Sequence, residues 1–219
     1  RVAVDLMEVE GAAKTLLKSG CDSVCLFFIN GYANPENEKK AAEVLRKIWP
    51  NEHVSVATEI LPEIREFERC STTTLNAYLQ PPVANYLARI EDRIKEKNQT
   101  TEILIVQSNG GVMSIETAKS RPIKTALSGP AAGVVAAREI ASAAGFNNII
   151  TGDMGGTSFD VSLVANGQNM LTAQANIDFG MTIRTPMIEM TTIGAGGGSI
   201  AKIDKTGFLE IGPESAGSD

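Results

Sequence analysis

Residues 149–164 have the sequence IITGDMGGTSFDVSLV, and no other part of the chain says as much about its structure. The first residues form an apolar run typical of a strand, and the last ones alternate between apolar and polar side chains, as a half-buried strand does. Between the two runs lies a turn with paired glycines and hydroxyl side chains. The pattern predicts a hairpin whose turn carries ligand-binding groups.

The turn has the groups that bind a phosphate. Gly155 and Gly156 lack Cβ atoms, so they can reach backbone dihedrals closed to other residues and let a ligand approach the main chain. Successive N–H groups in such a turn can form an anion-binding concavity, and Thr157 and Ser158 add hydroxyl donors. We therefore expect these four residues to contact the phosphates of a cofactor.

Two aspartates bracket the turn, Asp153 before it and Asp160 after it. Both are predicted ligands of Mg²⁺, which usually keeps several waters and takes few carboxylates. Asp153 comes at the strand end and is the preferred catalytic residue, whereas Asp160 could pair structurally within the hairpin. A hairpin without any ligand remains the alternative, because paired glycines and aspartate are common in ordinary turns.

A helix of small residues precedes the hairpin, with the sequence LSGPAAGVVAAREIASAAG over residues 127–145. Ser128 or Gly129 can serve as N-cap with Pro130 at the first helical position, and Gly145 suits the C-terminal stop. The small side chains let the helix lie close to a sheet or another helix. A helix followed by a strand and an Asp-x-Gly-Gly-Thr turn resembles the linking helix and second phosphate loop of the superfold of actin, sugar kinases and heat-shock chaperone ATPases.

Five segments narrow the resemblance: residues 63–69 continued by 71–79, then 107–111, 128–131, 152–161 and 192–201. In content and order they are similar to signature segments of the hydantoinase A, N-methylhydantoinase A and 5-oxoprolinase family. One glycine motif would be weak, but five in order over most of the chain are specific. The resemblance implies an α/β fold of the actin-like ATPase (ribonuclease H-like) type, as an internal fragment.

The resemblance also implies a chemistry. Members of the family look like enzymes that use ATP and Mg²⁺ to open cyclic amides such as hydantoins or 5-oxoproline, commonly with a hydantoinase B-like subunit as partner. Asp153 would be catalytic and, with Asp160, would hold the metal, while the turn would hold the phosphates. Related subunits serve ATP-dependent ketone carboxylases, which is one alternative. Another ATPase of the superfold and a non-catalytic scaffold subunit are the others.

Two further loops are candidates for ligand contacts. Residues 194–198 contain four glycines in five positions and cannot form a regular element. We expect Gly196, Gly197 and Gly198 to face a cofactor and Ser199 a substrate, with a hinge or a crowded packing point as the alternative. Asn109 follows a predicted strand end, where open α/β sheets usually place ligands, and is a second substrate candidate.

The sequence also departs from the family pattern. The first phosphate loop and the adenine-binding glycine segment of the superfold are not found in the chain. The chain starts at Arg1 within a strand-like pattern and ends in a loop, so we take it for an internal piece. We expect this piece alone to bind ATP weakly and not to turn over.

Composition and charge exclude several classes of protein. A net charge of −6 and a pI near 5.0 argue against a broadly basic nucleic-acid surface. No apolar run approaches the roughly 20 residues that span a bilayer, and the start lacks a signal-peptide pattern. We expect a cytoplasmic protein with no membrane association, in which Cys21, Cys25 and Cys70 are reduced, buried thiols. The single histidine, His53, excludes a histidine-rich zinc site within the chain.

The remaining pattern predicts two parts with a parallel or mixed sheet flanked by helices. Residues 1–127 would be the C-terminal part of a first ATPase-like domain, and residues 128–219 the linking helix and a strand-rich second domain start. In the first part we expect a helix over 11–19, a strand over 23–29, a helix through Ile48 and a strand over 54–58, paired in parallel. A helical stretch over 71–97, interrupted at Pro81-Pro82, and a strand over 102–106 follow. In the second part, strands are expected over 169–175 and 187–192, and a hairpin over 200–211.

Overall fold

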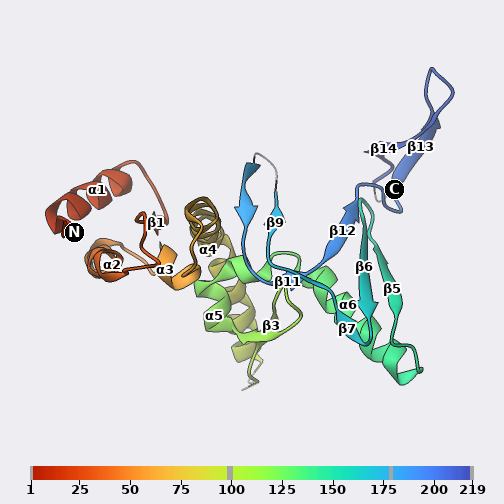
Figure 1. Cartoon of the computed structure of the whole chain (residues 1–219), viewed down its shortest axis with the longest axis horizontal. Helices are drawn as coiled ribbons and strands as arrows, with labels where there is room; N and C mark the ends of the chain where they lie inside the picture. Colours follow the sequence, from red (N-terminus) through yellow and green to blue (C-terminus); the bar gives the residue numbers. More distant parts are fainter. Residues whose placement is uncertain (1, 98–100, 178–179, 218–219) are drawn as a thin grey trace. The chain divides into compact units, whose positions relative to one another are not determined.

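The computed structural model describes residues 2–97, 101–177 and 180–217 and has a mixed α/β fold. It divides into two compact units, and each is described by itself. The first unit comprises Arg1–Gln107, Val112–Ala126 and Ala173–Thr185, and the second comprises Ser108–Gly111, Leu127–Thr172 and Pro186–Asp219 (Figure 1). The division into two ATPase-like domains at Ser128 stays a prediction.

The expected β-α-β arrangement opens the first unit. Strand β1 (Val24–Leu26) pairs in parallel with β2 (Val54–Val56), and helix α2 (Glu36–Ile48) connects them. Acidic residues in the first turn of α2 and basic residues in its last turn suit the helix dipole. The parallel pairing is therefore confirmed, and Pro35 occupies the N-cap position of α2.

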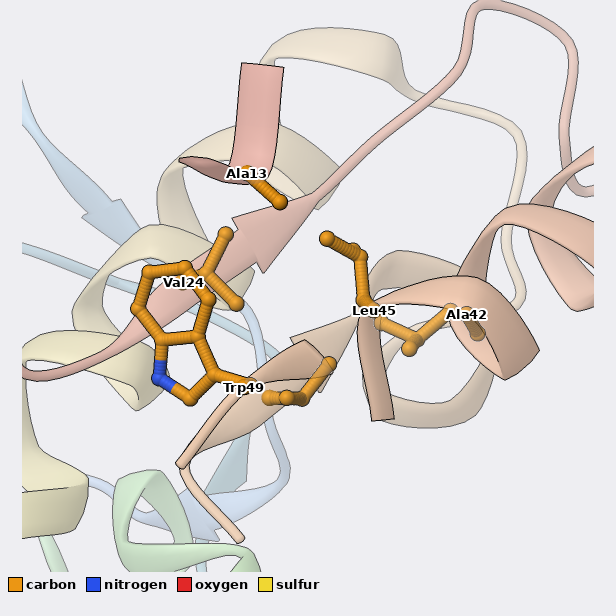
Figure 2. Close-up of a cluster of buried hydrophobic side chains, with 7 residues drawn as sticks. Ala13, Val24, Ala42, Leu45 and Trp49 are labelled. Atoms are coloured by element: carbon orange, nitrogen blue, oxygen red, sulfur yellow. The ribbon is translucent and has the colours of Figure 1, made fainter. Parts of the chain in front are cut away.

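A small apolar core joins these elements to the N-terminal helix α1 (Leu6–Lys18). Trp49 packs at its centre and is 4% exposed, and its indole N–H donates to the Asp22 carbonyl oxygen at 3.4 Å. Figure 2 shows how Ala13 of α1 and Val24 of β1 approach the side chains of α2 and its end. The core consists of Ala13, Val24, Ala42, Leu45, Trp49, Val54 and Val56.

Helix α1 begins earlier than the sequence predicted. Asp5 is its N-cap and accepts hydrogen bonds from the N–H groups of Met7 and Glu8. This capping side chain sets the start, and Gly11 is tolerated inside the helix. The predicted stop is confirmed, because Gly20 follows the helix with a φ of +81°.

Helix α4 (Glu66–Glu96) runs through Pro81 and Pro82 without the predicted break. Two prolines remove two intrahelical N–H donors, so the helix must be held on both sides of them. On one side, Asn76 and Gln80 donate to the carbonyl oxygen of Ser120 at 3.1 and 3.2 Å. On the other, Leu87 belongs to a core with Met113, Ile115 and Ala118. Tertiary contacts thus override the local preference.

The buried face of the first half of α4 is polar. Arg69 is 0% exposed and pairs with the equally buried Glu38 at 3.2 Å and with Glu66 at 2.7 Å. The Glu38 carboxylate also accepts from the N–H groups of Phe28 and Thr58, both at 2.9 Å. The other buried polar residues on this face are Thr72, Thr73, Asn76 and Gln80.

Short elements complete the first unit. They are α3 (Ala57–Ile60), the antiparallel pair β3 (Leu104–Val106) and β4 (Val112–Ser114), α5 (Ile115–Ser120), a 3₁₀ helix (Pro122–Thr125), and the antiparallel pair β9 (Ala175–Asn176) and β10 (Thr182–Ile183). Ser71 and Thr72 of α4 hydrogen-bond the backbone of residues 182 and 184, which fixes β10 on this helix.

The second unit is built on the predicted hairpin. Strands β5 (Ile149–Met154) and β6 (Phe159–Ala165) pair antiparallel, so the hairpin is confirmed, and β12 (Met190–Ile193) extends the sheet in the order β12-β6-β5. Helix α6 (Ser128–Ala143) lies along β5, β6 and β7 (Gln168–Asn169) (Figure 1). Their shared core contains Ala131, Val134, Val164 and Ile188.

The N-terminus of α6 differs from the prediction, and its C-terminus agrees with it. Leu127, with a φ of 59°, occupies the N-cap position, the helix begins at Ser128, and Pro130 lies inside its first turn. At the other end Gly145 has a φ of +87°, and the N–H groups of Gly145 and Phe146 donate to the carbonyl oxygens of Ser142 and Ala141. These two bonds form a Schellman motif, so the predicted stop is confirmed.

The rest of the second unit is short strands. Strand β8 (Leu171–Thr172) pairs with β11 (Met187–Ile188), and β13 (Ser199–Ile203) with β14 (Leu209–Ser215) as the expected hairpin. The strand expected over 169–175 is instead divided among β7, β8 and β9. Within the described ranges, none of the helices is both long and apolar enough to cross a bilayer.

Candidate functional site

The candidate site is a row of three side chains across the sheet of the second unit. Asp153 of β5 lies opposite Asp160 of β6, and Asp160 lies opposite Thr192 of β12. Residues directly opposite one another share a face of the sheet. We call these three residues the acidic row.

The register also shows which face this is. Four residues along the same strands, Ile149 lies opposite Val164, and both belong to the core that packs against α6. Side chains at every second position share a face, so the acidic row faces the side of the sheet that α6 covers. A Cβ atom built at Gly133 of α6 would lie 3.8 Å from Asp153 Oδ2. The small-residue helix therefore brings its backbone close to the Asp153 carboxylate, as its composition predicted.

The two aspartates have different surroundings. The Thr192 hydroxyl donates to Asp160 Oδ1 at 2.5 Å, and Asp160 is half-buried. Asp153 is exposed, and no side chain or N–H group among the described residues donates to its carboxylate. Asp160 is held within the sheet, whereas Asp153 is free to bind something else.

A cavity of about 490 Å³ opens between α6 and this face of the sheet. Asp153 and Asp160 both line it, so the structure brings together the two carboxylates predicted to hold a metal. Across the described ranges, histidine, cysteine and acidic side chains do not gather in groups of three or more that could hold a metal ion. The lining residues are Pro130, Gly133, Val134, Ala137, Ile149, Ile150, Thr151, Gly152, Asp153, Asp160 and Met190.

The turn after Asp153 is open to solvent. Gly155 N–H donates to the Ser158 carbonyl oxygen at 2.9 Å, which closes the turn. Neither Gly155 nor Gly156 has a φ in the left-handed region, so the expectation that these glycines supply unusual dihedrals is wrong for this conformation. A Cβ at Gly156 would meet no atom within 4 Å. The advantage of these glycines is an uncovered main chain, not a special backbone angle.

The glycine loop 194–198 packs against this turn. A Cβ at Gly196 would lie 2.6 Å from the Gly155 oxygen, from the Gly156 carbonyl carbon and from the Thr157 nitrogen. Gly196 must therefore lack a side chain for the two backbones to meet. Crowded packing, which was the alternative reading of the loop, explains Gly196, and direct cofactor contact by Gly196, Gly197 and Gly198 stays a prediction.

The two predicted substrate residues make local contacts. Ser199 Oγ accepts from Gly196 N–H at 2.9 Å, within the glycine loop. Asn109 is exposed in the loop between β3 and β4, where its Oδ1 accepts from Gly111 N–H at 2.9 Å. Neither residue is among those that line the cavity beside the acidic row. Their assignment to a substrate stays a prediction.

Sequence reasoning missed Thr192 and Gly133. Thr192 stands just before the glycine loop, in one of the five segments, and its place beside Asp160 depends on the pairing of β12 with β6. Gly133 was one of many small residues in the helix. Only the register of the sheet and the position of α6 bring both to the aspartates.

Comparison with known proteins gives one family. A family model described as Hydantoinase/oxoprolinase matches residues 69–219. The chain is 35% identical to the caprolactamase subunit alpha of Pseudomonas jessenii over 99% of its own length and 31% of that protein. It is 32% identical to the 5-oxoprolinase of Saccharomyces cerevisiae over 98% of its length and 16% of that enzyme.

Solved structures agree with these matches. The crystal structure of ATP-dependent caprolactamase from Pseudomonas jessenii superposes with a TM-score of 0.83 at 35% identity, over 100% of this chain and 33% of that one. The nucleotide-free structure of acetone carboxylase, from work on ATP-dependent acetone carboxylation, superposes with a TM-score of 0.77 at 27% identity. The match covers 94% of this chain and 29% of that one. The chain thus spans a third or less of the length of these relatives.

Proposed function

The chain belongs to the hydantoinase/oxoprolinase family, and on that premise we propose that it is part of an ATP-dependent hydrolase that opens cyclic amides of the hydantoin or 5-oxoproline type. One observation supports the proposal most strongly. Asp153 is an exposed carboxylate without a protein donor, between a turn of open main chain and a cavity that Asp160 shares. The actin-like ATPase fold and the domain division at Ser128 are part of the same proposal.

The residues fit a magnesium nucleotide. Mg²⁺ takes few protein carboxylates and keeps its waters, and two carboxylates in register on one face suit that coordination. Open N–H groups in a glycine turn suit phosphate oxygens, with the hydroxyls of Thr157 and Ser158 beside them. The caprolactamase that is similar in structure is ATP-dependent, and the similar acetone carboxylase comes from work on ATP-dependent acetone carboxylation.

Each part of the site has one task in this proposal. When bound, ATP supplies a phosphoryl group that makes an amide or carboxyl oxygen a better leaving group. Phosphoryl transfer depends on positioning and charge neutralisation more than on a protein nucleophile. Residues 155–158 would hold phosphate oxygens, Asp153 would hold Mg²⁺ or orient the attacking group, and Asp160 would be a second carboxylate for the metal. The Thr192 hydroxyl holds the Asp160 carboxylate at 2.5 Å and so fixes its direction.

A ketone carboxylase is the second candidate, because the structural match extends to acetone carboxylase. Both reactions fit the same site, since each begins with activation of an oxygen by a phosphoryl group. The matching caprolactamase and carboxylase chains are named as subunits. We therefore propose a partner subunit of the hydantoinase B type, and a cytoplasmic location.

The test uses the full-length parent protein with its partner subunit. Phosphate release and product formation are measured with ATP and, in separate reactions, hydantoins, 5-oxoproline, simple lactams, or ketones with bicarbonate. Phosphate release that depends on a cyclic amide, with ring opening, supports the hydrolase. Release only with a ketone and bicarbonate supports the carboxylase. Ring opening without phosphate release would show an ATP-independent hydrolase. If neither phosphate release nor product formation is observed, the chain would be part of a scaffold subunit.

A further inference from the structure

The glycine loop does more than fill space beside the turn. Gly197 N–H donates to the Gly155 carbonyl oxygen, and Gly198 N–H donates to the Gly156 carbonyl oxygen, both at 2.9 Å. Two consecutive carbonyl groups of the turn therefore point toward the same loop. Their direction is fixed by backbone contacts alone.

Fixing a carbonyl also fixes the next N–H group. In a planar trans peptide, the C=O of one residue and the N–H of the next point in opposite directions. The Gly155 carbonyl points to the loop, so the N–H of Gly156 points away from it. The Gly156 carbonyl does the same, so the N–H of Thr157 also points away from the loop.

Two consecutive N–H groups on one side are unusual in an extended strand, where they alternate, and they make the concavity that binds anions. Neither N–H group has a protein acceptor among the described residues. Nothing within 4 Å would meet a Cβ at Gly156, so the main chain there is uncovered. The turn thus presents two consecutive donors on the side away from the loop, in an exposed stretch of main chain.

We infer that the 194–198 loop is a positioning element, which aims the N–H groups of Gly156 and Thr157 at a phosphate oxygen of the nucleotide. The inference rests on the proposed function for the identity of the anion. It assigns the loop an indirect role in place of direct contact. The N–H groups of Gly196, Gly197 and Gly198 are not needed by a ligand in this account, because each of the three already donates within the protein.

The glycines of the loop form a graded series for a test by alanine substitution. A Cβ at Gly194 would meet nothing within 4 Å, and one at Gly197 would lie in ordinary contact at 3.7 Å from the Gly155 oxygen. A Cβ at Gly198 would lie 3.0 Å from the Gly156 oxygen and from Ser215 Oγ, and one at Gly196 would lie 2.6 Å from the turn. None of these four glycines has a positive φ, so only the contacts differ among the variants.

The experiment measures ATP affinity by calorimetry, with Mg²⁺ present, in full-length variants of the parent protein. Amide exchange of the turn peptide is followed with and without ATP. We expect Gly194→Ala to match the wild type. Gly198→Ala and Gly196→Ala should weaken binding increasingly, by about tenfold or more for Gly196→Ala, as for one lost hydrogen bond to a charged group. ATP should slow exchange at Gly156 and Thr157 in the wild type and less in these two variants.

The order of the series decides the outcome. A loss with Gly197→Ala as large as that with Gly196→Ala would show that the loop contacts the nucleotide itself, against the inference. Unchanged ATP affinity in folded Gly198→Ala protein would overturn it as well, and this milder variant gives the answer if Gly196→Ala does not fold. A wild type that does not bind ATP would refute the proposed function and this inference together. Wild-type binding without the predicted order would refute the inference alone.

Discussion

The Thr192 hydroxyl donates to Asp160 Oδ1 at 2.5 Å. Thr192 lies on β12 and Asp153 on β5, the two strands that flank Asp160 on β6. Asp160 lies on the middle strand of the three, whereas Asp153 lies on β5 at the edge of this order. The two aspartates that look equivalent in the sequence therefore differ: one is held by a neighbour and the other is free. This difference underlies the roles proposed for them.

Replacing Thr192 by valine should weaken magnesium nucleotide binding with little effect on folding. Valine keeps the β-branched shape that suits a strand but removes the donor to Asp160. Hydrogen bonds to charged groups contribute about 1.5–3 kcal/mol, so we expect affinity to fall by about tenfold. Calorimetry of the full-length protein with ATP and Mg²⁺ measures this. Thr192→Ser, which retains the hydroxyl, should restore binding, and equal losses in both variants would refute the role of the hydrogen bond.

The buried Arg69–Glu38 pair should matter far more for stability than a surface pair. Arg69→Met leaves the fully buried Glu38 without its cation, and breaking such a pair costs about 3–5 kcal/mol. Arg46→Gln is the matched control, because Arg46 and Glu59 are 49% and 46% exposed and such pairs contribute about 1 kcal/mol or less. Urea unfolding followed by fluorescence of Trp49, the only tryptophan of the chain, measures both. Similar losses in the two variants would contradict the role of burial.

Gly152 should not tolerate a side chain while Phe159 is present. A Cβ at Gly152 would lie 2.7 Å from the Phe159 ring, and overpacking typically costs about 1–3 kcal/mol. Gly152→Ala should therefore lower the unfolding midpoint, and Phe159→Leu in the same chain should recover part of the loss. A double-mutant cycle by urea unfolding gives the coupling. Additive effects would show that the ring and the glycine do not interact.

The Cys25 thiol should be poorly reactive in the folded protein. Burial raises its pKa from the ordinary 9.0 to about 11, although the hydrogen bond from Thr74 opposes this shift. The thiolate is the reactive form, so alkylation by iodoacetamide at pH 8 should be much slower than in urea, as mass spectrometry of the Cys25 peptide can show. Because the folded pKa is raised, the stability linked to this thiol is present below pH 9 and is lost as the pH rises toward 11. Cys25→Ser should flatten that part of the pH profile, and an unchanged profile would contradict the assignment.

Sequence patterns predicted the elements whose structure depends mainly on residues near one another in the chain. The hairpin of residues 149–164, the parallel β1–β2 pair and the glycine stop of α6 follow from periodicity and backbone preference. Helix α4 was mispredicted at Pro81 because contacts from distant segments hold it. The three cysteines are half-buried, so the expectation that they are buried is wrong, and their reduced state stays a prediction.

The site was predictable in its chemistry and not in its arrangement. Asp153 and Asp160 could be named from the sequence because they bracket one turn. Thr192 could not, because only strand pairing brings it to Asp160. The glycine loop left two readings open, since its packing against the turn joins backbones far apart in the chain.

The most direct test of the proposed function is phosphate release by the full-length protein with its partner subunit and a substrate, compared between the wild type and Asp153→Ala. Asp153 is exposed, so the variant should fold and melt like the wild type. We predict that substrate-dependent phosphate release falls by about a hundredfold or more, as for loss of a group that positions the reacting atoms. Phosphate release at the wild-type rate in the folded variant would contradict the account.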